Sequence, residues 1–233
     1  ALREMTHSEG GFYSAQDADS EGVEGKFFVW DKPEIESVLH KAGFSTLDIE
    51  QFCAFYDISE EGNWEEKNIL HREQPYEVYS SEKGIDSELF KQKLQAQRKA
   101  LFITRDQRIY PGLDDKIMLS WSALMISAFA QASTALGNRD YATQAEKILN
   151  FALNQFFPGY GSHTSDWPAG GLHTWKNGVA HIPAFLEDYA YLIAALLDVW
   201  QVTFKPHYLE AAKTLAVYTV EHFFDPSDNL FFF

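Results

Sequence analysis

The sequence predicts a mainly α-helical fold, specifically a partial (α/α)6 toroid, in which helical hairpins surround a central funnel and small β-hairpins extend from one rim. Two observations predict this fold. An uncharged, helix-length segment at residues 117–136 precedes an amphipathic one at residues 140–156, and the same order returns at residues 189–203 and 207–225. A helix that is apolar on all sides is buried on all sides, whereas a helix with one apolar stripe lies at the surface. Inner helices that alternate with outer ones are typical of an α/α toroid.

The first inner segment, residues 117–136, contains fourteen apolar residues and no charge. Gly137-Asn138 ends it, and Asp140 is expected to cap the outer helix that follows. The segment is long enough to cross a bilayer, but serine, threonine and glutamine side chains interrupt it and a surface helix follows at once. We therefore expect a buried helix and no membrane partner.

Shorter elements are expected in the first half of the chain, where turn-forming and acidic residues are frequent. Asp86 is expected to cap the longest helix of this half. The expected elements are a β-hairpin or meander at residues 10–30, helices at residues 33–42, 47–58 and 86–105, and a short strand at residues 77–79.

Two irregular excursions, residues 10–30 and 158–181, are expected to form β-hairpins at the rim. Gly-Gly followed by an apolar residue occurs at residue 10 and again at residue 170, and Asn177-Gly178 is a strong signal for a two-residue hairpin turn. A third excursion is expected to begin at residues 228–231. The apparent repeat is therefore helix, helix, hairpin, and such excursions surround the mouth of the funnel, where a ligand would bind.

The chain is expected to form a single domain over residues 1–233. A closed ring of six helical hairpins needs roughly 350 residues or more. The sequence is therefore expected to cover part of a ring and to be a fragment of a longer protein, with the ring-closing helices outside it.

The net charge of −15 is concentrated in residues 1–90, which carry −14, while residues 91–233 carry −1. An acidic surface argues against nucleic acid and anionic membranes as partners, because both attract basic patches. Cys53 is the single cysteine, so we expect no disulfide framework, no cysteine-based zinc site and a cytoplasmic location. No cofactor and no metal are expected, since the sequence has neither a glycine-rich phosphate loop nor a zinc-binding histidine motif.

The residues proposed for catalysis are two acidic pairs and a histidine. Each pair stands at the expected start of an inner helix, where a carboxylate either acts as a general acid or base in the funnel or caps the helix. The histidine belongs to a group of three in the second excursion, and two neighbouring imidazoles can exchange a proton at a sugar carbon. These candidates are Asp114, Asp115, Glu187, Asp188 and His181, beside His163 and His173.

The residues proposed to bind a substrate are carboxylates, aromatic side chains and one lysine. The acidic run from Asp17 to Gly22 is similar to half of a calcium loop, but its twelfth position is Phe28 instead of glutamate. A turn capped by its own aspartate side chains is therefore preferred. An indole ring stacks on a sugar or fills the core. The binding candidates are Asp17, Asp19, Lys116, Trp121, Tyr189 and Trp175.

Several blocks of the sequence resemble one protein family. The blocks are Arg3-Glu4-Met5-Thr6, Gly10-Gly11-Phe12-Tyr13-Ser14-Ala15, Asp17-Ala18-Asp19-Ser20-Glu21-Gly22, Glu24-Gly25-Lys26-Phe27, Pro111-Gly112-Leu113-Asp114-Asp115-Lys116 and Leu186-Glu187-Asp188-Tyr189-Ala190. In this order they are similar to the YyaL-like or spermatogenesis-associated protein 20 family of thioredoxin-domain-containing proteins. Where the family pattern reads Trp-Asn-Gly-Leu, this chain has Trp121-Ser122-Ala123-Leu124, so any ligand contact of that asparagine is altered here.

The resemblance implies a longer protein in which a thioredoxin-like domain precedes an α/α toroid similar to N-acylglucosamine 2-epimerases and six-hairpin glycosidases. It assigns no reaction. One hypothesis is carbohydrate metabolism, in which an isomerase, epimerase or glycoside hydrolase uses rim carboxylates on a small-molecule carbohydrate. The other is a non-catalytic interaction or scaffold module that accompanies the thioredoxin-like domain of the same full-length protein. Whether the chain is an enzyme stays open.

Overall fold

The chain folds as two compact units. The computed structural model describes residues 1–161 and 170–232. Residues 1–15 and 113–233 form one unit, here called the hairpin unit, and residues 16–112 form the other, the acidic unit. The sequence predicts a single domain, whereas the structure divides the same length because the helices of the acidic unit enclose a hydrophobic core of their own. The described residues are mainly helical, with small antiparallel sheets.

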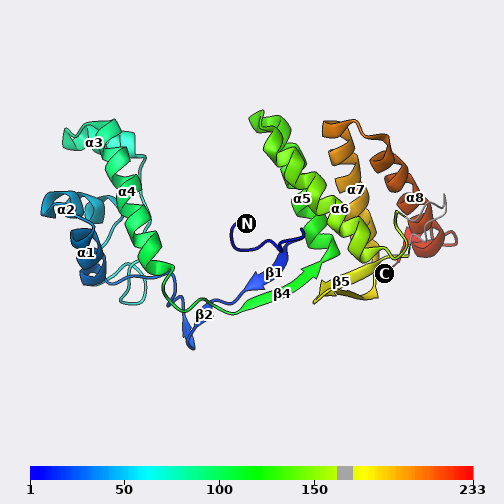
Figure 1. Cartoon of the computed structure of the whole chain (residues 1–233), viewed down its shortest axis with the longest axis horizontal. Helices are drawn as coiled ribbons and strands as arrows, with labels where there is room; N and C mark the ends of the chain where they lie inside the picture. The colour runs from blue at the N-terminus through cyan, green and yellow to red at the C-terminus, as the bar shows by residue number, and fades with distance from the viewer. Residues whose placement is uncertain (162–169, 233) are drawn as a thin grey trace. The chain divides into compact units, whose positions relative to one another are not determined.

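Four helices make up most of the hairpin unit (Figure 1). They are α5 (Leu119–Leu136), α6 (Arg139–Phe156), α7 (Leu186–Thr203) and α8 (Pro206–Phe223). Helix α5 packs against α6 and α7, and α7 packs against α8, so each apolar helix is followed by an amphipathic partner as predicted. One cap differs from the prediction. Asn138, not Asp140, is the N-cap of α6, and its side chain accepts a hydrogen bond from the Asp140 backbone N–H at 2.9 Å.

Helices α5 and α7 run parallel and in register. Near their N-termini, the backbone N–H of Ser120 donates to the carboxylate of Asp188 at 3.0 Å, and further along the side chain of Gln131 donates to Asp198 at 3.3 Å. The partners of the two bonds are 68 and 67 residues apart in the sequence. Equivalent positions of the two helices therefore lie side by side, as an internal repeat requires.

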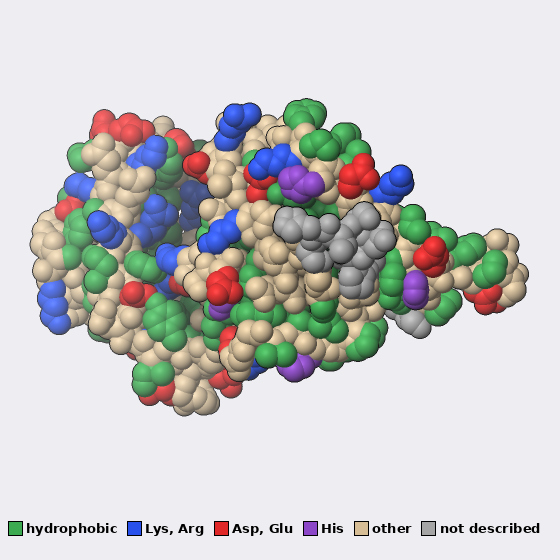
Figure 2. Space-filling view, turned by 45° about the vertical axis from the view of Figure 1, so that its right-hand side comes forward, with side chains coloured by type: hydrophobic (Ala, Val, Ile, Leu, Met, Phe, Trp, Pro, Cys, Tyr) green, Lys and Arg blue, Asp and Glu red, His purple; other side chains and the backbone are tan. Residues whose placement is uncertain are grey.

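One side of each apolar helix is exposed to solvent. In α5, Trp121 and Leu124 are 48% and 50% exposed, and in α7 Tyr191 is 40% exposed. Within the residues that the structure describes, the prediction that these helices are buried on all sides is therefore wrong, because neighbouring helices and the sheet cover only part of each helix. Figure 2 shows hydrophobic side chains among charged ones on the face that it presents. No helix in residues 1–161 or 170–232 combines the length and the apolar composition needed to cross a bilayer.

A four-stranded sheet with the order β1-β4-β5-β6 lies at the end of the bundle from which α5 and α7 begin (Figure 1). Its strands are β1 (Tyr13–Gln16), β4 (Leu113–Met118), β5 (Leu172–Lys176) and β6 (Val179–Pro183). The predicted turn at Asn177-Gly178 joins β5 to β6, and both turn residues have positive φ. The acidic pair Asp114 and Asp115 lies in β4, so the prediction that it stands at the start of an inner helix is wrong.

A second small hairpin follows the second helix pair. It consists of β7 (Phe224–Asp225) and β8 (Leu230–Phe231), which pair antiparallel. Helices α5 and α6 are thus followed by the β5–β6 hairpin, and α7 and α8 by the β7–β8 hairpin. The predicted order of helix, helix, hairpin is confirmed, while a closed or partial ring stays a prediction.

Two glycines allow backbone segments to pass close to rings of α6 and its C-terminal end. A Cβ atom at Gly11 would lie 2.7 Å from Cε1 of Phe151, and one at Gly171 would lie 2.5 Å from Cε1 of Phe157. Gly11 also has a φ of +78°, a conformation that side chains disfavour. Both Gly-Gly motifs of the sequence therefore mark close packing where an excursion begins.

The acidic unit contains four helices and a short hairpin among its described residues. These elements are α1 (Lys32–Lys41), α2 (Thr46–Phe55), α3 (Tyr76–Lys83), α4 (Ser87–Arg105), β2 (Asp19–Ser20) and β3 (Val23–Glu24). Helix α4 packs against α1, α2 and α3 and buries Phe90, Leu94 and Leu101 against them. Asp86 caps α4 as predicted, since its side chain accepts the backbone N–H of Leu89 at 2.7 Å.

Two expectations for the acidic unit are wrong. Residues 77–79 belong to helix α3, which starts after Pro75 and ends at Gly84 in the left-handed conformation, so they form no strand. Residues 26–28 form turns and Trp30 forms an isolated antiparallel bridge with Asn68, so residues 26–30 form no hairpin strand. The carbonyl groups of Lys26, Phe27 and Val29 instead accept hydrogen bonds from the side chain of Arg108.

Candidate functional site

A buried carboxylate joins the N-termini of α5 and α7. Asp188 has no exposed surface. Its Oδ1 accepts the N–H of Ser120 at 3.0 Å, and its Oδ2 accepts the N–H of Phe185, the N-cap residue of α7, at 2.9 Å. Nδ1 of His173 lies 2.8 Å from the same Oδ2. One side chain thus satisfies backbone donors of two helix N-termini and orients an imidazole.

The imidazole of His173 lies on β5 and is 8% exposed. Because Nδ1 bonds to Asp188, a neutral ring carries its proton on Nδ1 and leaves Nε2 as an acceptor. Ser120 Oγ is buried and has no hydrogen-bond partner among the described residues. The three side chains therefore form no serine–histidine–aspartate relay, which needs a serine hydroxyl bonded to the imidazole.

Two predicted site residues are sequence neighbours of this junction. Trp121 follows Ser120 in α5, and half-buried Glu187 precedes Asp188 in α7. Because Ser120 and Asp188 are hydrogen-bonded, Trp121 and Glu187 belong to adjacent first turns. The structure therefore places one predicted binding residue and one predicted acid at the same end of the helix pair.

The other predicted acids lie on the sheet and are paired with lysines. Lys176 Nζ on β5 lies 2.5 Å from Asp115 Oδ1, and Lys116 Nζ lies 3.4 Å from Asp114 Oδ2. The hydrogen bond from Lys176 holds the pKa of Asp115 below its ordinary value of 3.8. Lys176, the partner of Asp115, and His173, the partner of Asp188, are three residues apart on β5, a distance of about 10 Å. The two acidic pairs therefore occupy different places in the hairpin unit.

His181 lies on the opposite face of the β5–β6 hairpin from His173. His181 is paired with Thr174, so these two share one face, while the neighbouring His173 faces the core. His181 is exposed and its carbonyl accepts the hydroxyl of Thr174 at 3.3 Å. The proton exchange proposed for these imidazoles is not supported by this geometry. His163 lies outside the described residues.

One cavity of the hairpin unit brings two sequence-predicted residues together. Asp115 and Trp175 were proposed separately, one for catalysis and one for binding. Both line a cavity of about 370 Å³ at the edge of the sheet. The complete lining is His7, Glu9, Tyr13, Asp115, Trp175, Asn177 and Gly178. It combines carboxylates, an amide, an imidazole and aromatic side chains, and this cavity is called the sheet-edge pocket below.

Aromatic contacts hold His7 in the sheet-edge pocket. Its ring lies 4.9 Å from the ring of Trp175 and 6.0 Å from that of Tyr13, both edge to face. Nδ1 of His7 accepts the backbone N–H of Glu9 at 3.2 Å, so a neutral ring carries its proton on Nε2. Trp175 is 4% exposed and donates through Nε1 to Gln155 at 3.2 Å, so only its edge contributes to the wall.

No sequence pattern singles out His7, Glu9 and Tyr13 as site residues. The one sequence feature that could indicate them as site residues is their position, because they flank the Gly10-Gly11 motif at the start of the first excursion. The close packing of Gly11 on α6 carries this segment to the edge of the sheet. Local sequence periodicity does not reveal such long-range packing.

The remaining binding candidates have structural partners. Tyr189 is 2% exposed, its hydroxyl accepts the N–H of Gly171 at 2.8 Å, and burial raises its pKa. Its ring is therefore closed to a ligand. Asp17 and Asp19 are exposed in the acidic unit, where Asp17 Oδ1 accepts the N–H of Asp19 at 3.1 Å. This is the self-capped turn preferred over a calcium loop.

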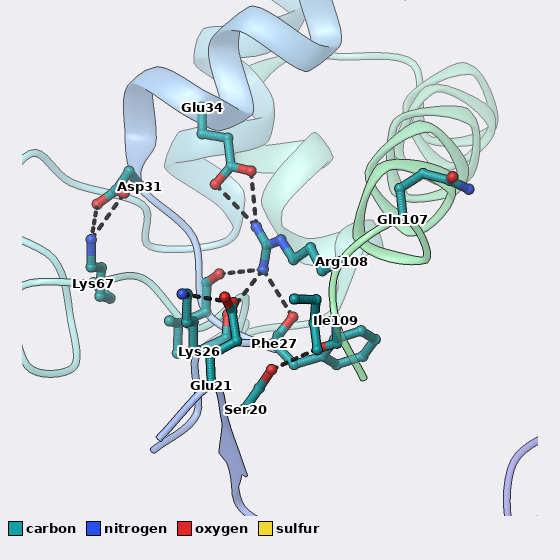
Figure 3. A pocket seen from close by; sticks show the side chains of 11 residues that line it. Ser20, Glu21, Lys26, Phe27, Asp31, Glu34, Lys67, Gln107, Arg108 and Ile109 are labelled. Carbon is teal, nitrogen blue, oxygen red and sulfur yellow. Dashed lines mark hydrogen bonds and ion pairs between the residues drawn. The ribbon is translucent and has the colours of Figure 1, made fainter. Parts of the chain in front are cut away.

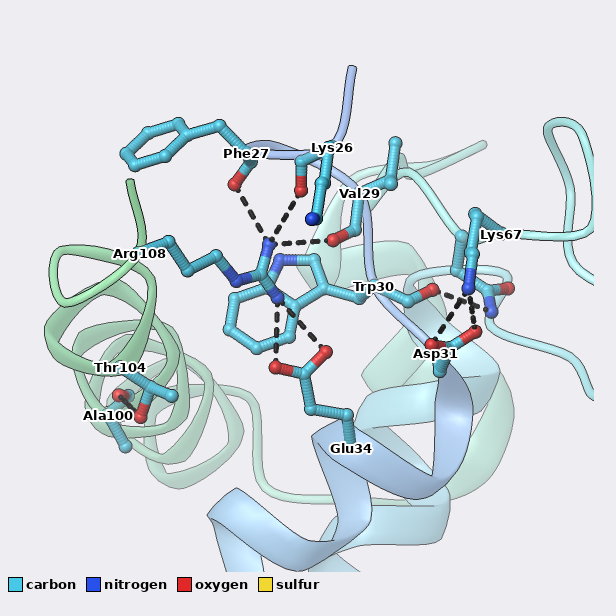
Figure 4. Close-up of polar contacts among 11 residues, drawn as sticks. Lys26, Phe27, Val29, Trp30, Asp31, Glu34, Lys67, Ala100, Thr104 and Arg108 are labelled. Atoms are coloured by element: carbon cyan, nitrogen blue, oxygen red, sulfur yellow. Dashed lines mark hydrogen bonds and ion pairs between the residues drawn. The ribbon is translucent and has the colours of Figure 1, made fainter. Parts of the chain in front are cut away.

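The largest cavity described in the acidic unit, about 430 Å³, surrounds the side chain of Arg108 (Figure 3). The guanidinium bonds both oxygens of Glu34 at 3.0 Å and lies 4.0 Å from the ring centre of Trp30. It also donates to the carbonyls of Phe27 and Val29 at 2.8 Å (Figure 4). Both terminal nitrogens of this guanidinium are used in holding residues 26–29 to α1. The side chain of Arg108 therefore has a structural role, and the cavity around it is a poor candidate for ligand binding.

Metal binding receives no support from the described part of the chain. No group of three or more His, Cys, Asp or Glu side chains in residues 1–161 and 170–232 is arranged to hold an ion. Cys53 is buried in the acidic unit, and burial raises the pKa of its thiol to about 11. The thiol is therefore protonated near neutral pH and a poor ligand or nucleophile.

Comparisons with known proteins identify relatives of this chain. No protein-family model matches it. Uncharacterized protein B0495.5 of Caenorhabditis elegans is 30% identical over 92% of the chain, and spermatogenesis-associated protein 20 of Homo sapiens is 28% identical over 98%. The protein of the same name from Rattus norvegicus is 30% identical over 91%. The chain spans about a third of the length of these curated relatives. By this similarity, which extends over nearly all of its residues, the chain belongs to the family of spermatogenesis-associated protein 20.

Proposed function

We propose that the hairpin unit binds a small carbohydrate in the sheet-edge pocket. The observation that carries the proposal is the meeting of Asp115 and Trp175 with His7, Glu9 and Tyr13 around one cavity of about 370 Å³. Carboxylates and amides bind sugar hydroxyl groups by hydrogen bonds, and an aromatic ring contacts the apolar face of a sugar ring, a role that falls to the half-buried Tyr13 because Trp175 is buried. A cavity of this volume is large enough for a monosaccharide.

The charges in the pocket favour proton exchange over glycoside hydrolysis. Lys176 keeps Asp115 ionised, so this carboxylate accepts hydrogen bonds from sugar hydroxyl groups and is the only member of the pair Asp115 and His7 that can act as the base. His7 carries its proton on Nε2 when neutral, so it is the donor of the pair. An acid and a base that flank one carbon are what an isomerase or epimerase requires. A hydrolase needs, besides one ionised carboxylate, a second carboxylic acid whose pKa is raised, and Asp115, whose pKa is lowered, can supply only the ionised group.

The alternative is a non-catalytic module that binds the thioredoxin-like domain proposed for the full-length protein. The exposed apolar side chains of Trp121, Leu124 and Tyr191 on two adjacent helices favour it, because exposed large apolar side chains are typical of an interaction face. The ion pairs of Asp114 and Asp115 with lysines also fit a structural role. In either case the unpaired Cys53 thiol supports the proposed cytoplasmic location.

A monosaccharide binding screen, followed by ligand-observed NMR, tests the proposal on the purified chain and on Asp115→Asn. We expect at least one sugar to bind, and Asp115→Asn to weaken it by about tenfold. Asp114→Asn is the matched control, because Asp114 is the neighbouring acid on β4 and does not line the pocket. Its affinity should change less than about twofold. Equal losses in both variants, or no binding sugar at all, would reject the proposal.

The reaction class is tested with the sugar that binds. In deuterium oxide, an isomerase or epimerase places deuterium on the reacting carbon, and His7→Gln should abolish this exchange while leaving binding within about threefold. A glycoside hydrolase would instead release a reducing sugar from a glycoside. Binding without either reaction supports the non-catalytic alternative.

A further inference from the structure

A second surface lies in the acidic unit, along one face of helix α4. Two cavities, of about 390 and 120 Å³, share Arg98 as a lining residue. The α4 residues that line them recur at spacings of three and four, from Lys91 through Arg98 to Arg105, which places them on one face of the helix. Residues 69–76 supply part of the opposite wall. The two cavities together are called the α4 groove.

The α4 groove is apolar along its floor and at its edge. Trp30 and Leu101 are buried beneath it, with 4% and 3% of their surfaces exposed. At the edge of the larger cavity, Phe28 and Ile69 are both 43% exposed. Hydrophobic side chains with this exposure leave apolar surface in contact with water. A ligand that covers them therefore gains free energy from burial.

The helix that borders the groove is basic, although the unit around it is acidic. Residues 16–112 contain 20 acidic and 12 basic side chains, a net charge of −8, whereas α4 contains five basic side chains and one acidic. Lys91, Arg98 and Arg105 follow one another at intervals of seven residues, or about 10.5 Å along a helix. A row of cations thus extends for about 21 Å beside the apolar floor.

The arginines of the groove lack the acidic partners that other cations of this unit have. Lys93 is paired with Asp48, and Arg108 with Glu34. Within the part of the chain that the structure describes, Arg72, Arg98 and Arg105 form no ion pair with a carboxylate.

Arg105 is the most enclosed of these three arginines. Its guanidinium lies 5.2–5.6 Å from the ring centres of Phe27, Phe28 and Phe102, and its buried Nε has no hydrogen-bond acceptor in the described residues. Aromatic rings stabilise a cation but leave its N–H groups without acceptors. Because Nε itself is buried, an external carboxylate would bond the outer nitrogens of this guanidinium, for which the aromatic rings supply no acceptor.

We propose that the α4 groove binds an extended, acidic segment of a partner protein, with apolar side chains of the segment in the two cavities and its carboxylates on the arginines. An extended chain rises about 3.3 Å per residue, so about six or seven residues span the cationic row. A helix would need about fourteen residues to span the same row. Nucleic acid is disfavoured, because it has no aliphatic side chains to fill the two cavities, and because the net charge of the unit repels a long polyanion more strongly than a short segment with few carboxylates.

The test uses the whole chain and a fluorescein-labelled heptapeptide in which glutamate alternates with leucine and phenylalanine. Fluorescence anisotropy should show saturable binding that weakens as salt is raised, because screening reduces ion pairing. A control peptide with glutamine in place of glutamate should bind at least about tenfold more weakly. A single-stranded oligonucleotide of equal charge should also bind more weakly than the acidic peptide.

Three variants assign binding to the groove. Arg98→Glu should weaken peptide binding by about tenfold or more, and Ile69→Ser by about threefold. Lys99→Glu makes the same change of charge at the adjacent exposed residue of α4, which lines neither cavity, and should change affinity less than about twofold. Circular dichroism confirms that each variant is folded. Equal losses for Arg98→Glu and Lys99→Glu, an absence of saturable binding, or tighter binding of the oligonucleotide would each overturn the proposal. None of these results depends on carbohydrate binding in the hairpin unit.

Discussion

Replacing Asp188 tests the structural role of the buried carboxylate that joins α5 and α7. In Asp188→Ala, the N–H groups of Ser120 and Phe185 and the Nδ1 of His173 lose their shared partner. All three bonds are 2.8–3.0 Å long, and Asp188 has no exposed surface. Water therefore cannot replace the carboxylate without entering the core.

The expected loss of stability follows from these contacts. A buried donor without an acceptor costs about 1–3 kcal/mol, and removing one member of a buried polar pair costs about 3–5 kcal/mol. Because the three bonds share one acceptor group, their costs do not add fully. We expect Asp188→Ala to lower the free energy of unfolding of the hairpin unit by about 3–5 kcal/mol. Asp188→Asn keeps the shape and one acceptor oxygen, so its cost should be about 1–3 kcal/mol.

Urea unfolding monitored by circular dichroism measures the loss, and hydrogen exchange locates it. Exchange of the amides of Ser120 and Phe185 should accelerate in Asp188→Ala, because these amides bond to the missing carboxylate. Asp198→Ala is the control on the same helix, since Asp198 is only partly buried and contacts Gln131 at 3.3 Å; its cost should stay below about 0.5 kcal/mol. A loss below about 1 kcal/mol in Asp188→Ala, with unchanged amide exchange, would refute this reasoning.

Three further predictions concern other parts of the chain. Gly11→Ala should cost about 1–3 kcal/mol in urea unfolding, because its Cβ would meet the ring of Phe151 at a positive φ; an unchanged midpoint would contradict the packing argument. The hydrogen bond from Lys93 lowers the pKa of Asp48 from 3.8, so the stability it contributes is present above pH 3.8 and is lost as the pH falls through the folded pKa. Lys93→Met should return the pKa of Asp48 toward 3.8 in a carbon-13 NMR titration, and no rise would disprove the pairing. Cys53 should resist iodoacetamide at pH 8 in the folded chain and react after unfolding, because burial raises the pKa of its thiol to about 11; equal rates would show that the thiol is accessible.

Helices with strong periodicity could be predicted from the sequence, and strands formed by distant partners could not. The long helices of the second half, α5 to α8, begin within a few residues of their predicted positions, because apolar spacing and glycine stops are local signals. Strand β4 is not among the elements that the sequence predicts. Ile117 is its one fully buried residue, and the strand is defined by pairing with Trp175, far away in the sequence. Such pairing leaves no local pattern.

The candidate pocket was predictable only in part for the same reason. Asp115 and Trp175 were recognised by residue type, but their meeting depends on the pairing of β4 with β5. His7 joins them because the segment around Gly11 packs closely on α6. For Asp188, the sequence suggested both capping and catalysis. The structure places this carboxylate out of contact with solvent, which favours capping.

The register of the two apolar helices explains why the sequence predicts more burial than the structure has. With equivalent positions 67 residues apart, Trp121 of α5 corresponds to Asp188 of α7, and Ala128 corresponds to Ala195. The α7 residues of these pairs are fully buried and lie on the side that faces α5, whereas the α5 residues are exposed. In the internal repeat, the exposed stripe of α5 therefore corresponds to the face that α7 packs against α5. If a further helix of the repeat covers this stripe, every side of α5 is buried, and this burial explains why α5 is apolar on every side. A ring of helical hairpins has this arrangement.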